Sequence, residues 1–421
     1  MKEYAILRLI LMTAAIVLSL TVFRVPAAFS QAVGGDVGGG AGIFRPKNPE
    51  TKRAAKPATP VTKPGTTTRT STRTTRTPRP TAAVNDDRVE DLLDMGNELR
   101  DARRFAEAEE AYQGVFKLRP RDARAAYGLG NVFTDQQRWE AAEASYRDAV
   151  QWNPKNVDAL VALSVVLVQP RTGAGNAKRL ADAEAFARRA VQIEPKNAVA
   201  WDRLGVAMET RGSFTPELEH SYRRAIEVDP QFAVGYAHLA RVLKRFGKQV
   251  EAAPLYDQAF SLAKDPATLN LIAESMQDEQ LWEKSGPVLK RALELDARNP
   301  TALLLMGRML LVFKRYSEAE PYLKTATEVS PRAFQPFNLL GRTYLAMNRL
   351  SDAELTYERA AEFAPAGDRK QLAGTFGFAG IGDEYMKAKE KTNAERAYLR
   401  ALELDPDNPE LQQKLSQARS R

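Results

Sequence analysis

Seven prolines recur along the chain, each at the end of a stretch of about 34 residues that has the same order of small and large apolar residues: Pro120, Pro154, Pro195, Pro230, Pro331, Pro365 and Pro406. Self-similarity at such a period is typical of repeat architectures, because each unit is too small to bury its apolar face alone and must stack on its neighbours. The chain is therefore expected to fold as an array of stacked units. Its function is expected to depend on a surface and not on a deep pocket.

When each proline is placed at position 32 of a unit, the same template recurs nine times. Position 8 is always small, and position 27 is alanine in every unit except the first, which has Val115. The spacing of positions 4, 7, 8 and 11, and of positions 20, 24 and 27, predicts one apolar face on each of two helices. Position 24 is tyrosine in six units: Tyr112, Tyr146, Tyr222, Tyr256, Tyr357 and Tyr398. Each unit is thus expected to be a helical hairpin that ends at its proline.

This order of small, small, aromatic, small and proline residues resembles the tetratricopeptide repeat (TPR) family over residues 88–407. The resemblance implies an all-α fold, a right-handed TPR α-solenoid of about nine helix-turn-helix repeats. After the ninth unit, Leu411, Leu415 and Ala418 have helical spacing on a polar segment. Residues 408–421 are therefore expected to form a C-terminal capping helix that covers the last hairpin.

Two insertions and three prolines interrupt the template. The third unit gains seven residues around Gln169–Arg179, which we expect to form an exposed, basic loop. Seven more residues follow Pro365, near Ala366–Gly374, and predict that the second helix of the eighth unit or the first helix of the ninth is prolonged. Units five to seven carry a proline inside the expected second helix, which predicts locally altered curvature there: Pro254, Pro287 and Pro321.

The first 31 residues have the shape of a secretory signal peptide. Leu9–Phe23 is uncharged and mostly apolar, with Lys2 and Arg8 before it and small residues after it. The run is short for a membrane-spanning helix, which needs roughly 20 apolar residues. Because Arg24 follows the apolar run directly, an uncleaved N-terminal membrane anchor is the alternative. Either way the repeats are expected to be exported, and to be periplasmic, secreted or anchored to a membrane.

Residues 32–87 are rich in glycine and then in threonine, arginine, lysine and proline, a composition that predicts a disordered linker. Ten basic residues between positions 32 and 85 stand against only Asp36 and Glu50, so the linker is strongly basic and the repeats are close to neutral. A solvated spacer is one interpretation of the basic run, and contact with an anionic envelope surface is the other. Nucleic acid is not expected as a partner, because the linker has no aromatic residue after Phe44 on which bases could stack.

No motif in the sequence is typical of an enzyme. The chain has no cysteine, and its two histidines, His220 and His238, lack further ligands at a metal-binding spacing, so both are expected to be surface residues. Repeats and cap together use the whole of residues 88–421, which leaves no room for a catalytic domain. We therefore expect no catalytic residues, no metal and no cofactor.

In TPR proteins the first helices line a concave groove, and positions 2, 5, 9, 12 and 13 face it. Carrying those positions over by resemblance gives the candidate partner-binding residues Asn97, Asn131, Arg241, Lys244, Arg245, Glu274, Gln277, Asp278, Arg308, Asn338 and Arg342. The basic members are expected to recognise carboxylates or a phosphate through charge-assisted hydrogen bonds. The alternative is that these positions are polar only because they face water.

Together these features predict a non-catalytic scaffold or adaptor that binds partner peptides or proteins in its concave groove. A second hypothesis is an envelope-anchored structural assembly factor, for example in polysaccharide or pilus export, that uses the basic linker. A more remote hypothesis is a regulator or accessory of a glycosyltransferase-like enzyme. The sequence specifies no particular partner, because the residues shared with the TPR family pack the hairpins.

Overall fold

The computed structural model describes residues 47–51, 81–170, 175–365 and 367–420, with backbone only for residues 81–84. The expected signal peptide or anchor, residues 1–31, lies outside these ranges, as does most of the expected linker. Within the described ranges, no helix has both the length and the apolar character that crossing a membrane requires. Contacts divide the chain into two units. The N-terminal unit comprises residues 47–51 and the helices up to residue 262, and the C-terminal unit comprises the described residues from 263 onward.

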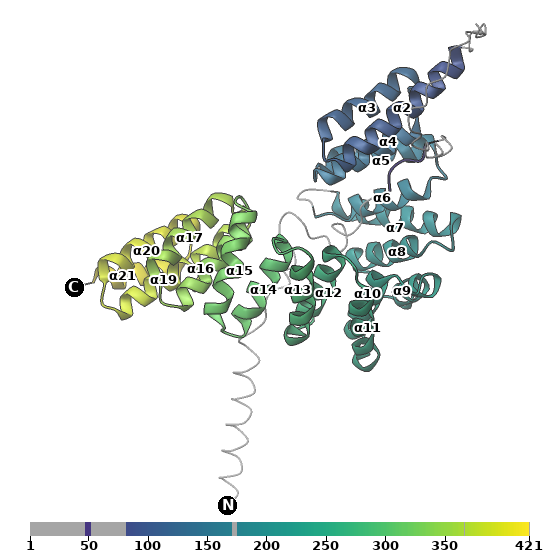
Figure 1. Ribbon diagram of the computed structural model, residues 1–421. Coiled ribbons are helices and arrows are strands. Elements are labelled where there is room, and N and C mark those ends of the chain that lie inside the picture. The colour runs from purple at the N-terminus through teal and green to yellow at the C-terminus, as the bar shows by residue number, and fades with distance from the viewer. Residues whose placement is uncertain (1–46, 52–80, 171–174, 366, 421) are drawn as a thin grey trace, which may run out of the picture. The chain divides into compact units, whose positions relative to one another are not determined.

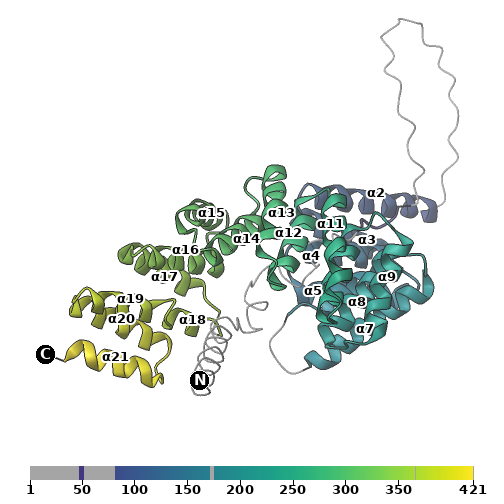
Figure 2. The ribbon, with the colours of Figure 1, turned by 90° about the horizontal axis from the view of Figure 1, so that it is seen from below.

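The N-terminal unit contains five helical hairpins that follow one another in chain order (Figures 1 and 2). The hairpins are α2 (Thr81–Asp101) with α3 (Phe105–Leu118), α4 (Ala123–Asp135) with α5 (Trp139–Trp152), α6 (Val157–Leu167) with α7 (Asn176–Ile193), α8 (Ala198–Arg211) with α9 (Pro216–Val228), and α10 (Ala233–Arg245) with α11 (Gln249–Leu262). The second helix of each hairpin also packs against the first helix of the next. The apolar faces are thus buried between neighbouring hairpins, as the period predicts.

The C-terminal unit contains four more hairpins of the same kind and a closing helix. They are α12 (Pro266–Asp278) with α13 (Trp282–Leu295), α14 (Pro300–Val312) with α15 (Tyr316–Val329), α16 (Phe334–Ala346) with α17 (Leu350–Phe363), α19 (Phe378–Lys387) with α20 (Lys391–Leu404), and finally α21 (Pro409–Arg419). Helix α21 packs on α20 and buries Leu411, Leu415 and Ala418. The prediction of an all-α repeat fold with a C-terminal cap is confirmed.

The template residues meet inside each hairpin. Tyr146 in α5 is fully buried, and its ring lies directly against Gly130 in α4, where an added Cβ would lie 2.4 Å from a ring carbon. The same contact recurs between Tyr112 and Gly96 in the first hairpin. In these repeats position 8 is therefore small because the tyrosine ring at position 24 occupies the space that a side chain would need.

A left-handed residue follows the first helix of every hairpin except the third, in which Gly175 directly precedes the second helix. At Gln137 the backbone has φ +57°, its N–H donates to the Thr134 carbonyl at 2.9 Å, and the next N–H, of Arg138, donates to the Phe133 carbonyl at 2.8 Å. This is the Schellman arrangement, which satisfies carbonyls at a helix end. One residue with positive φ lies between the two helices of every described hairpin: Arg103, Gln137, Gly175, Gly212, Gly247, Gln280, Lys314, Asn348 and Lys389.

The first insertion is helical only in its second half; residues 168–170 and 175 are not helical, and residues 171–174 lie outside the described residues. Helix α7 begins at Asn176 and runs for 18 residues, so the second half of the insertion extends this helix. Arg179 is helical, and its guanidinium donates to the carbonyl oxygens of Leu167 and Gln169 at 2.9 and 3.0 Å. A basic residue expected to be exposed instead binds the carbonyl end of α6, where cations are favoured.

The second insertion prolongs neither neighbouring helix, so that prediction was wrong. Helix α17 ends at Phe363, and a separate short helix, α18 (Arg369–Ala373), precedes α19. Helix α18 packs on α20 and buries Leu372. Gly377 turns the chain toward α19 so close to α18 that a Cβ there would lie 2.1 Å from the Leu372 carbonyl oxygen. The chain therefore turns tightly between α18 and α19, at a position where only glycine fits.

The interior prolines do not delay or end their helices. Helices α11, α13 and α15 each have 14 residues, the same length as the proline-free helices α3, α5 and α17. Pro254, Pro287 and Pro321 are each the sixth residue, so each removes one hydrogen bond near the start of its helix. The altered curvature that they predict remains a prediction.

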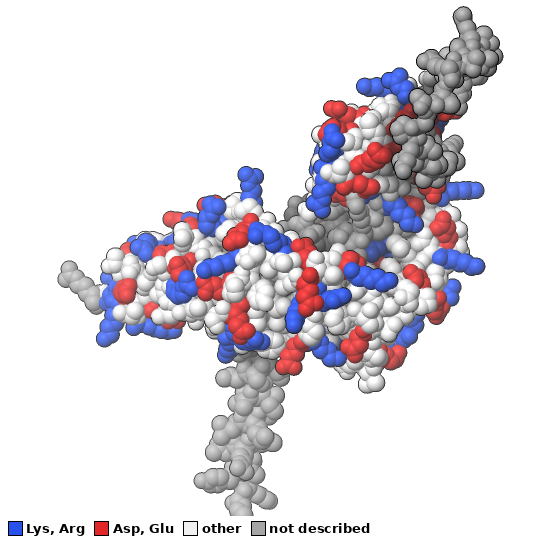
Figure 3. Space-filling model, in the orientation of Figure 1, with Lys and Arg blue, Asp and Glu red and all other residues white. Residues whose placement is uncertain are grey.

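The boundary of the expected linker also differs in the structure. Helix α2 begins at Thr81, inside the stretch 32–87 that the composition assigns to the linker. Residues 47–51 belong to the same stretch, yet they lie against the first two hairpins. Elsewhere, Figure 3 shows lysine and arginine side chains interspersed with aspartate and glutamate on the visible face, as a nearly neutral array would have.

Candidate peptide-binding groove

A short segment of the chain, Lys47-Asn-Pro-Glu-Thr51, lies across α2 and α4 without regular secondary structure. We call residues 47–51 the N-terminal segment. Pro49 is buried, whereas Lys47 and Glu50 are exposed. The segment contacts side chains that follow it by 48 to 84 residues in the sequence, so its position is set by tertiary contacts and not by local structure.

Two asparagines hold the main chain of this segment. The Nδ2 group of Asn97 in α2 donates to the Pro49 carbonyl at 3.1 Å, and the Nδ2 group of Asn131 in α4 donates to the Lys47 carbonyl at 2.8 Å. Both asparagines occupy position 9 of their repeats. Alternate carbonyls of an extended chain point the same way and lie about 6.6 Å apart along it. Two successive repeats thus bind carbonyls that are two residues apart.

The core tyrosines fix the orientation of these asparagines. The phenolic O–H of Tyr112 donates to Oδ1 of Asn97 at 2.7 Å, and that of Tyr146 donates to Oδ1 of Asn131 at 2.9 Å. With Oδ1 engaged as the acceptor, each amide presents its Nδ2 donor to the segment. Because burial raises the pKa of both tyrosines, each phenol keeps its proton and remains a donor.

The side-chain amide of Asn48 forms hydrogen bonds through both its oxygen and its nitrogen. Oδ1 of Asn48 accepts from Nη1 of Arg100 at 3.0 Å, and its Nδ2 donates to Oδ2 of Asp101 at 3.0 Å. The Arg100 side chain is only 1% exposed, and Asp135 holds it through two hydrogen bonds of 2.7 and 3.1 Å. A fixed donor and an acceptor therefore flank Asn48.

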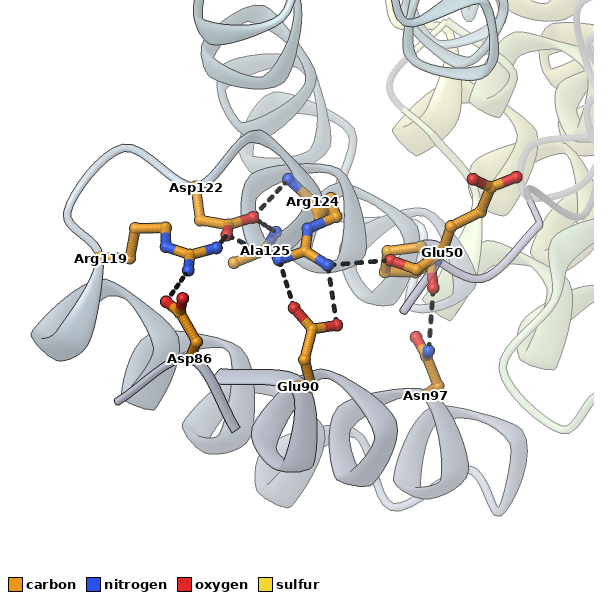
Figure 4. Close-up of polar contacts among 9 residues, drawn as sticks. Glu50, Asp86, Glu90, Asn97, Arg119, Asp122, Arg124 and Ala125 are labelled. Atoms are coloured by element: carbon orange, nitrogen blue, oxygen red, sulfur yellow. Dashed lines mark hydrogen bonds and ion pairs between the residues drawn. The ribbon is translucent and has the colours of Figure 1, made fainter. Parts of the chain in front are cut away.

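A second arginine reaches the segment from the start of α4 (Figure 4). Nη1 of Arg124 donates to the Glu50 carbonyl at 3.2 Å, while Glu90 of α2 accepts two hydrogen bonds of 3.0 Å from the same guanidinium. Asp122 accepts from Arg124 at 3.1 Å and caps α4. Burial would raise the pKa of Asp122, but the hydrogen bonds and charge of Arg124 outweigh it and hold that pKa below its usual range.

At the N-terminal end of the segment, the charge of Lys47 acts on Asp158 of α6. Asp158 is partly buried at position 2 of the third repeat. Burial raises the pKa of this carboxyl group, and the positive charge of Lys47 acts in the opposite direction. Lys47 therefore favours the ionised form of a carboxylate that burial disfavours.

The other basic groove residues of the N-terminal unit face a carboxylate of their own chain. Arg241 and Arg245 in α10 both form ion pairs with Glu209 of α8, at 2.6 and 3.0 Å. Glu209 also accepts from the Tyr222 phenol at 3.1 Å. Lys244 lies half-buried on the same helix. The two arginines are thus paired internally, whereas the sequence alone had suggested a basic surface.

One histidine lies where the sequence did not predict it. His238 in α10 has no exposed surface, and its Nδ1 lies 2.7 Å from Oδ1 of Asp202 in α8. The prediction of a surface residue was wrong for His238, because it occupies the contact between two first helices and not an outer face. His220 is exposed, with its ring 5.8 Å from that of Trp201.

In the C-terminal unit, the arginines at position 9 of two repeats are partly buried. Arg308 in α14 donates to Oε1 of Gln277 at 2.7 Å, while its buried Nη2 atom has no hydrogen bond among the described residues and lies 3.9 Å from Oδ1 of Asp278. Arg342 in α16 lies over the ring of Phe376, 5.0 Å from its centre. Burial lowers the pKa of both arginines. Of the remaining candidates, Asn338 is buried in α16, and Glu274 lies in α12.

Comparisons with known proteins agree with this architecture. Models of the tetratricopeptide repeat match residues 93–157, 314–368 and 378–408. The chain contains tetratricopeptide repeats. No curated protein matches its sequence.

Several solved structures are similar to this TPR protein. The crystal structure of MamA is 20% identical, with 40% of this chain and 94% of that chain covered and a TM-score of 0.35. Cut9 and Hcn1, crystallised as an APC/C hetero-tetramer, give 15% identity, coverage of 80% and 63%, and a TM-score of 0.47. TTC0263, a thermophilic TPR protein of Thermus thermophilus, gives 20% identity, coverage of 45% and 99%, and a TM-score of 0.38.

Four residues at groove positions of this TPR protein were not among the candidates predicted from the sequence. Arg100 and Asp101 occupy positions 12 and 13 of the first repeat, and Arg124 and Asp158 occupy position 2 of the second and third. Applying the groove positions to every repeat without selection would have found them. The N-terminal segment itself has no periodic signal, since it lies outside the repeats.

Proposed function

We propose that this TPR protein is a non-catalytic scaffold that binds extended peptide segments of partner proteins in the groove of its first two repeats. TPR proteins generally serve as scaffolds for protein–protein interaction. The observation that supports this site is the pair of hydrogen bonds from Asn97 and Asn131 to the carbonyls of Pro49 and Lys47. A groove that binds one extended segment through its main chain has the chemistry to bind others.

The polar groups of the groove are held before a partner arrives. Asn97 and Asn131 are oriented by tyrosines from the core, and Arg100 and Arg124 are fixed by carboxylates of α4 and α2. A groove that is ordered in advance loses little conformational entropy on binding, which favours affinity. Main-chain recognition leaves the partner free to differ at positions where the groove contacts no side chain.

The proposal includes the location of the protein. Residues 1–31 have the sequence pattern of a signal peptide or anchor, so we propose that the repeats bind their partners outside the cytoplasm. Fractionation of cells that express the full chain, with a cytoplasmic protein as the marker, tests this part. Recovery of the protein with the cytoplasmic marker would contradict it. The hypothesis of an envelope assembly factor depends on the basic linker and remains a prediction.

Peptide selection tests the binding function. A random peptide library is selected on the full chain carrying Asn48→Ala and Pro49→Gly, so that the N-terminal segment no longer competes. Selected peptides are then measured on the same chain with Asn97→Asp or Asn131→Asp added, which replaces the Nδ2 donor by an oxygen of nearly the same size. Each change is expected to weaken binding about tenfold or more, since a hydrogen bond is lost and a carboxylate then faces a carbonyl.

A matched control distinguishes the groove from a general effect on folding. Asn393→Asp changes an asparagine of α20 that bonds only to Glu390 within the described chain, and it is expected to leave peptide binding unchanged. Circular dichroism checks that each variant keeps its helices. If the selected peptides bind the Asn97 and Asn131 variants as tightly as the parent, the proposed site is wrong.

A further inference from the structure

We infer that residues 47–51 are an intramolecular ligand of the groove, which partner peptides must displace, and that these partners carry an Asn-Pro pair at the same place. This inference rests on the proposed function, because it assumes that the groove binds peptides. It goes further in naming both a competitor within the chain and a sequence preference. The argument depends on what the groove contacts besides the main chain.

The position of Asn48 selects for a carboxamide. Arg100 donates to its Oδ1 and Asp101 accepts from its Nδ2, both at 3.0 Å. An aspartate would keep the first contact and place a second carboxylate against Asp101, and an aliphatic residue would make neither contact. A side chain with a donor and an acceptor at this distance makes both of these contacts.

The next position suits proline for a different reason. Pro49 is buried, and the segment uses its carbonyl as an acceptor for Asn97 while needing no N–H donor there. Proline has no N–H, and its fixed φ reduces the entropy lost when the segment becomes ordered. It also disfavours the helical conformation for Asn48, which keeps the segment extended. The Asn-Pro pair therefore matches both chemistry and conformation.

The covalent connection to the repeats favours occupation of the groove by the N-terminal segment of the same chain. Residues 52–80 join the segment to α2, so its concentration at the groove is set by the chain and not by expression level. Connections of this kind typically give effective concentrations on the order of millimolar. A segment of five residues with a few hydrogen bonds is a weak ligand in free solution. The connection makes it a competent competitor that a tighter partner still displaces.

Competition has a measurable consequence. If the groove is open in only a fraction of molecules, the apparent dissociation constant of a partner rises by the inverse of that fraction. A segment that is bound in nine of ten molecules weakens partner binding about tenfold. Removing the segment's contacts without touching the repeats should therefore strengthen binding of an added peptide.

The test uses the full chain and a fluorescently labelled peptide with the sequence of residues 45–53. Fluorescence anisotropy gives its affinity for the wild-type chain and for the Asn48→Ala, Pro49→Gly double variant, whose changes lie outside the helices. We expect the double variant to bind the peptide about tenfold more tightly than the wild type. Thr59→Ala with Pro60→Gly alters a second polar-proline pair of the linker and should behave as the wild type.

Two further measurements examine specificity. A peptide with Asn48→Asp is expected to bind the double variant about tenfold or more weakly than the natural peptide, because it faces Asp101. Adding Asn131→Asp to the double variant should have a similar effect on the natural peptide. If the Asn48→Asp peptide binds as well as the natural one, the preference for a carboxamide is wrong.

Three outcomes would overturn the inference. Equal affinity of the labelled peptide for wild type and double variant would show that the segment does not occupy the groove. Absence of peptide binding to the double variant would show that the segment is no ligand, while library-selected peptides that depend on Asn97 would still support the proposed function. A concentration-dependent dimer in light scattering that the double variant abolishes would place the segment in a second copy of the chain.

Discussion

The phenolic oxygen of Tyr146 donates a hydrogen bond of 2.9 Å to Oδ1 of Asn131, and this contact joins the core of the second repeat to its groove. Tyr146 is a template residue, fully buried against Gly130. Asn131 is a groove residue that binds the Lys47 carbonyl. Because Tyr112 and Asn97 repeat the arrangement one repeat earlier, a tyrosine that packs the hairpin also orients the donor that binds the N-terminal segment.

Tyr146→Phe should therefore affect binding more than folding. The change removes the buried hydrogen bonds of the hydroxyl group to Asn131 and Thr134, each of which contributes about 0.5–1.5 kcal/mol to the free energy of unfolding, and it leaves the Asn131 amide free to turn. We expect peptide affinity to fall about three- to tenfold in the Asn48→Ala, Pro49→Gly background. Urea denaturation and fluorescence anisotropy measure the two effects.

Tyr222→Phe is the matched control for that substitution. Tyr222 has the same template position in the fourth repeat, but its phenol donates to Glu209 and not to a segment-binding residue. A similar loss of stability with unchanged binding of the 45–53 peptide is expected. Equal effects of the two substitutions on binding would contradict a specific role for Tyr146.

Gly130→Ala tests the close approach inside the hairpin. Its Cβ would lie 2.4 Å from the buried ring of Tyr146, so the ring or the backbone has to move. Overpacking of this kind typically costs about 1–3 kcal/mol, more than the roughly 1 kcal/mol that alanine gains over glycine in a helix. We expect a net loss of stability in urea denaturation. Gly286→Ala in α13, whose nearest neighbours lie at 3.5 Å, should instead be neutral or stabilising.

The turns inside the hairpins offer another prediction. Gly212 has φ +84° and open space around its Cα, so only backbone conformation opposes a side chain there. Gly212→Ala should destabilise the protein by about 1 kcal/mol, and Gln137→Gly should relieve a similar strain, less the entropy that glycine adds to the unfolded chain. The two midpoints in urea should move in opposite directions. A stabilising Gly212→Ala would show that the turn tolerates an ordinary side chain.

The fold could be predicted because the sequence repeats one pattern of small and large residues from unit to unit. Small residues at position 8 and large ones at position 24 recur along the array, and the glycine–tyrosine contact explains both. The left-handed turn recurs as regularly, but Arg103, Gln137 and Lys314 give no sequence signal of it, since a non-glycine residue with positive φ is decided by the two helices that it joins. Insertions were the least predictable, because α18 forms only where α20 covers it.

The sequence predicted two of the residues that contact the N-terminal segment, but not the segment itself. Asn97 and Asn131 followed from the repeat positions, and both contact the N-terminal segment. The segment could not be placed, because composition describes an average tendency of residues 32–87 and says nothing of five residues that find partners up to 84 positions away. Ion pairs within the chain also change the role that is expected of charged residues. Arg241 was expected to face a partner, but Glu209 of the preceding first helix neutralises it.

His238 provides a pH-dependent test of the same first-helix contacts. Burial lowers the pKa of His238, and the charges of Arg241 and Arg203 act in the same direction, against the hydrogen bond and charge of Asp202. The imidazole is therefore neutral in the folded protein down to a lower pH than in the unfolded chain, where its pKa is about 6.5.

The sign of the expected effect follows from proton linkage. The stability associated with neutral His238 is fully present above about pH 6.5 and decreases as the pH falls, because the unfolded chain then binds a proton that the folded protein excludes. Below pH 6.5 the free energy of unfolding should fall by up to about 1.4 kcal/mol per pH unit from this residue. His238→Gln should remove this part of the slope between pH 7 and 5 in urea denaturation, and His220→Gln, at the exposed histidine, should retain it. A wild-type slope in the His238→Gln variant would mean that other groups control the acid response.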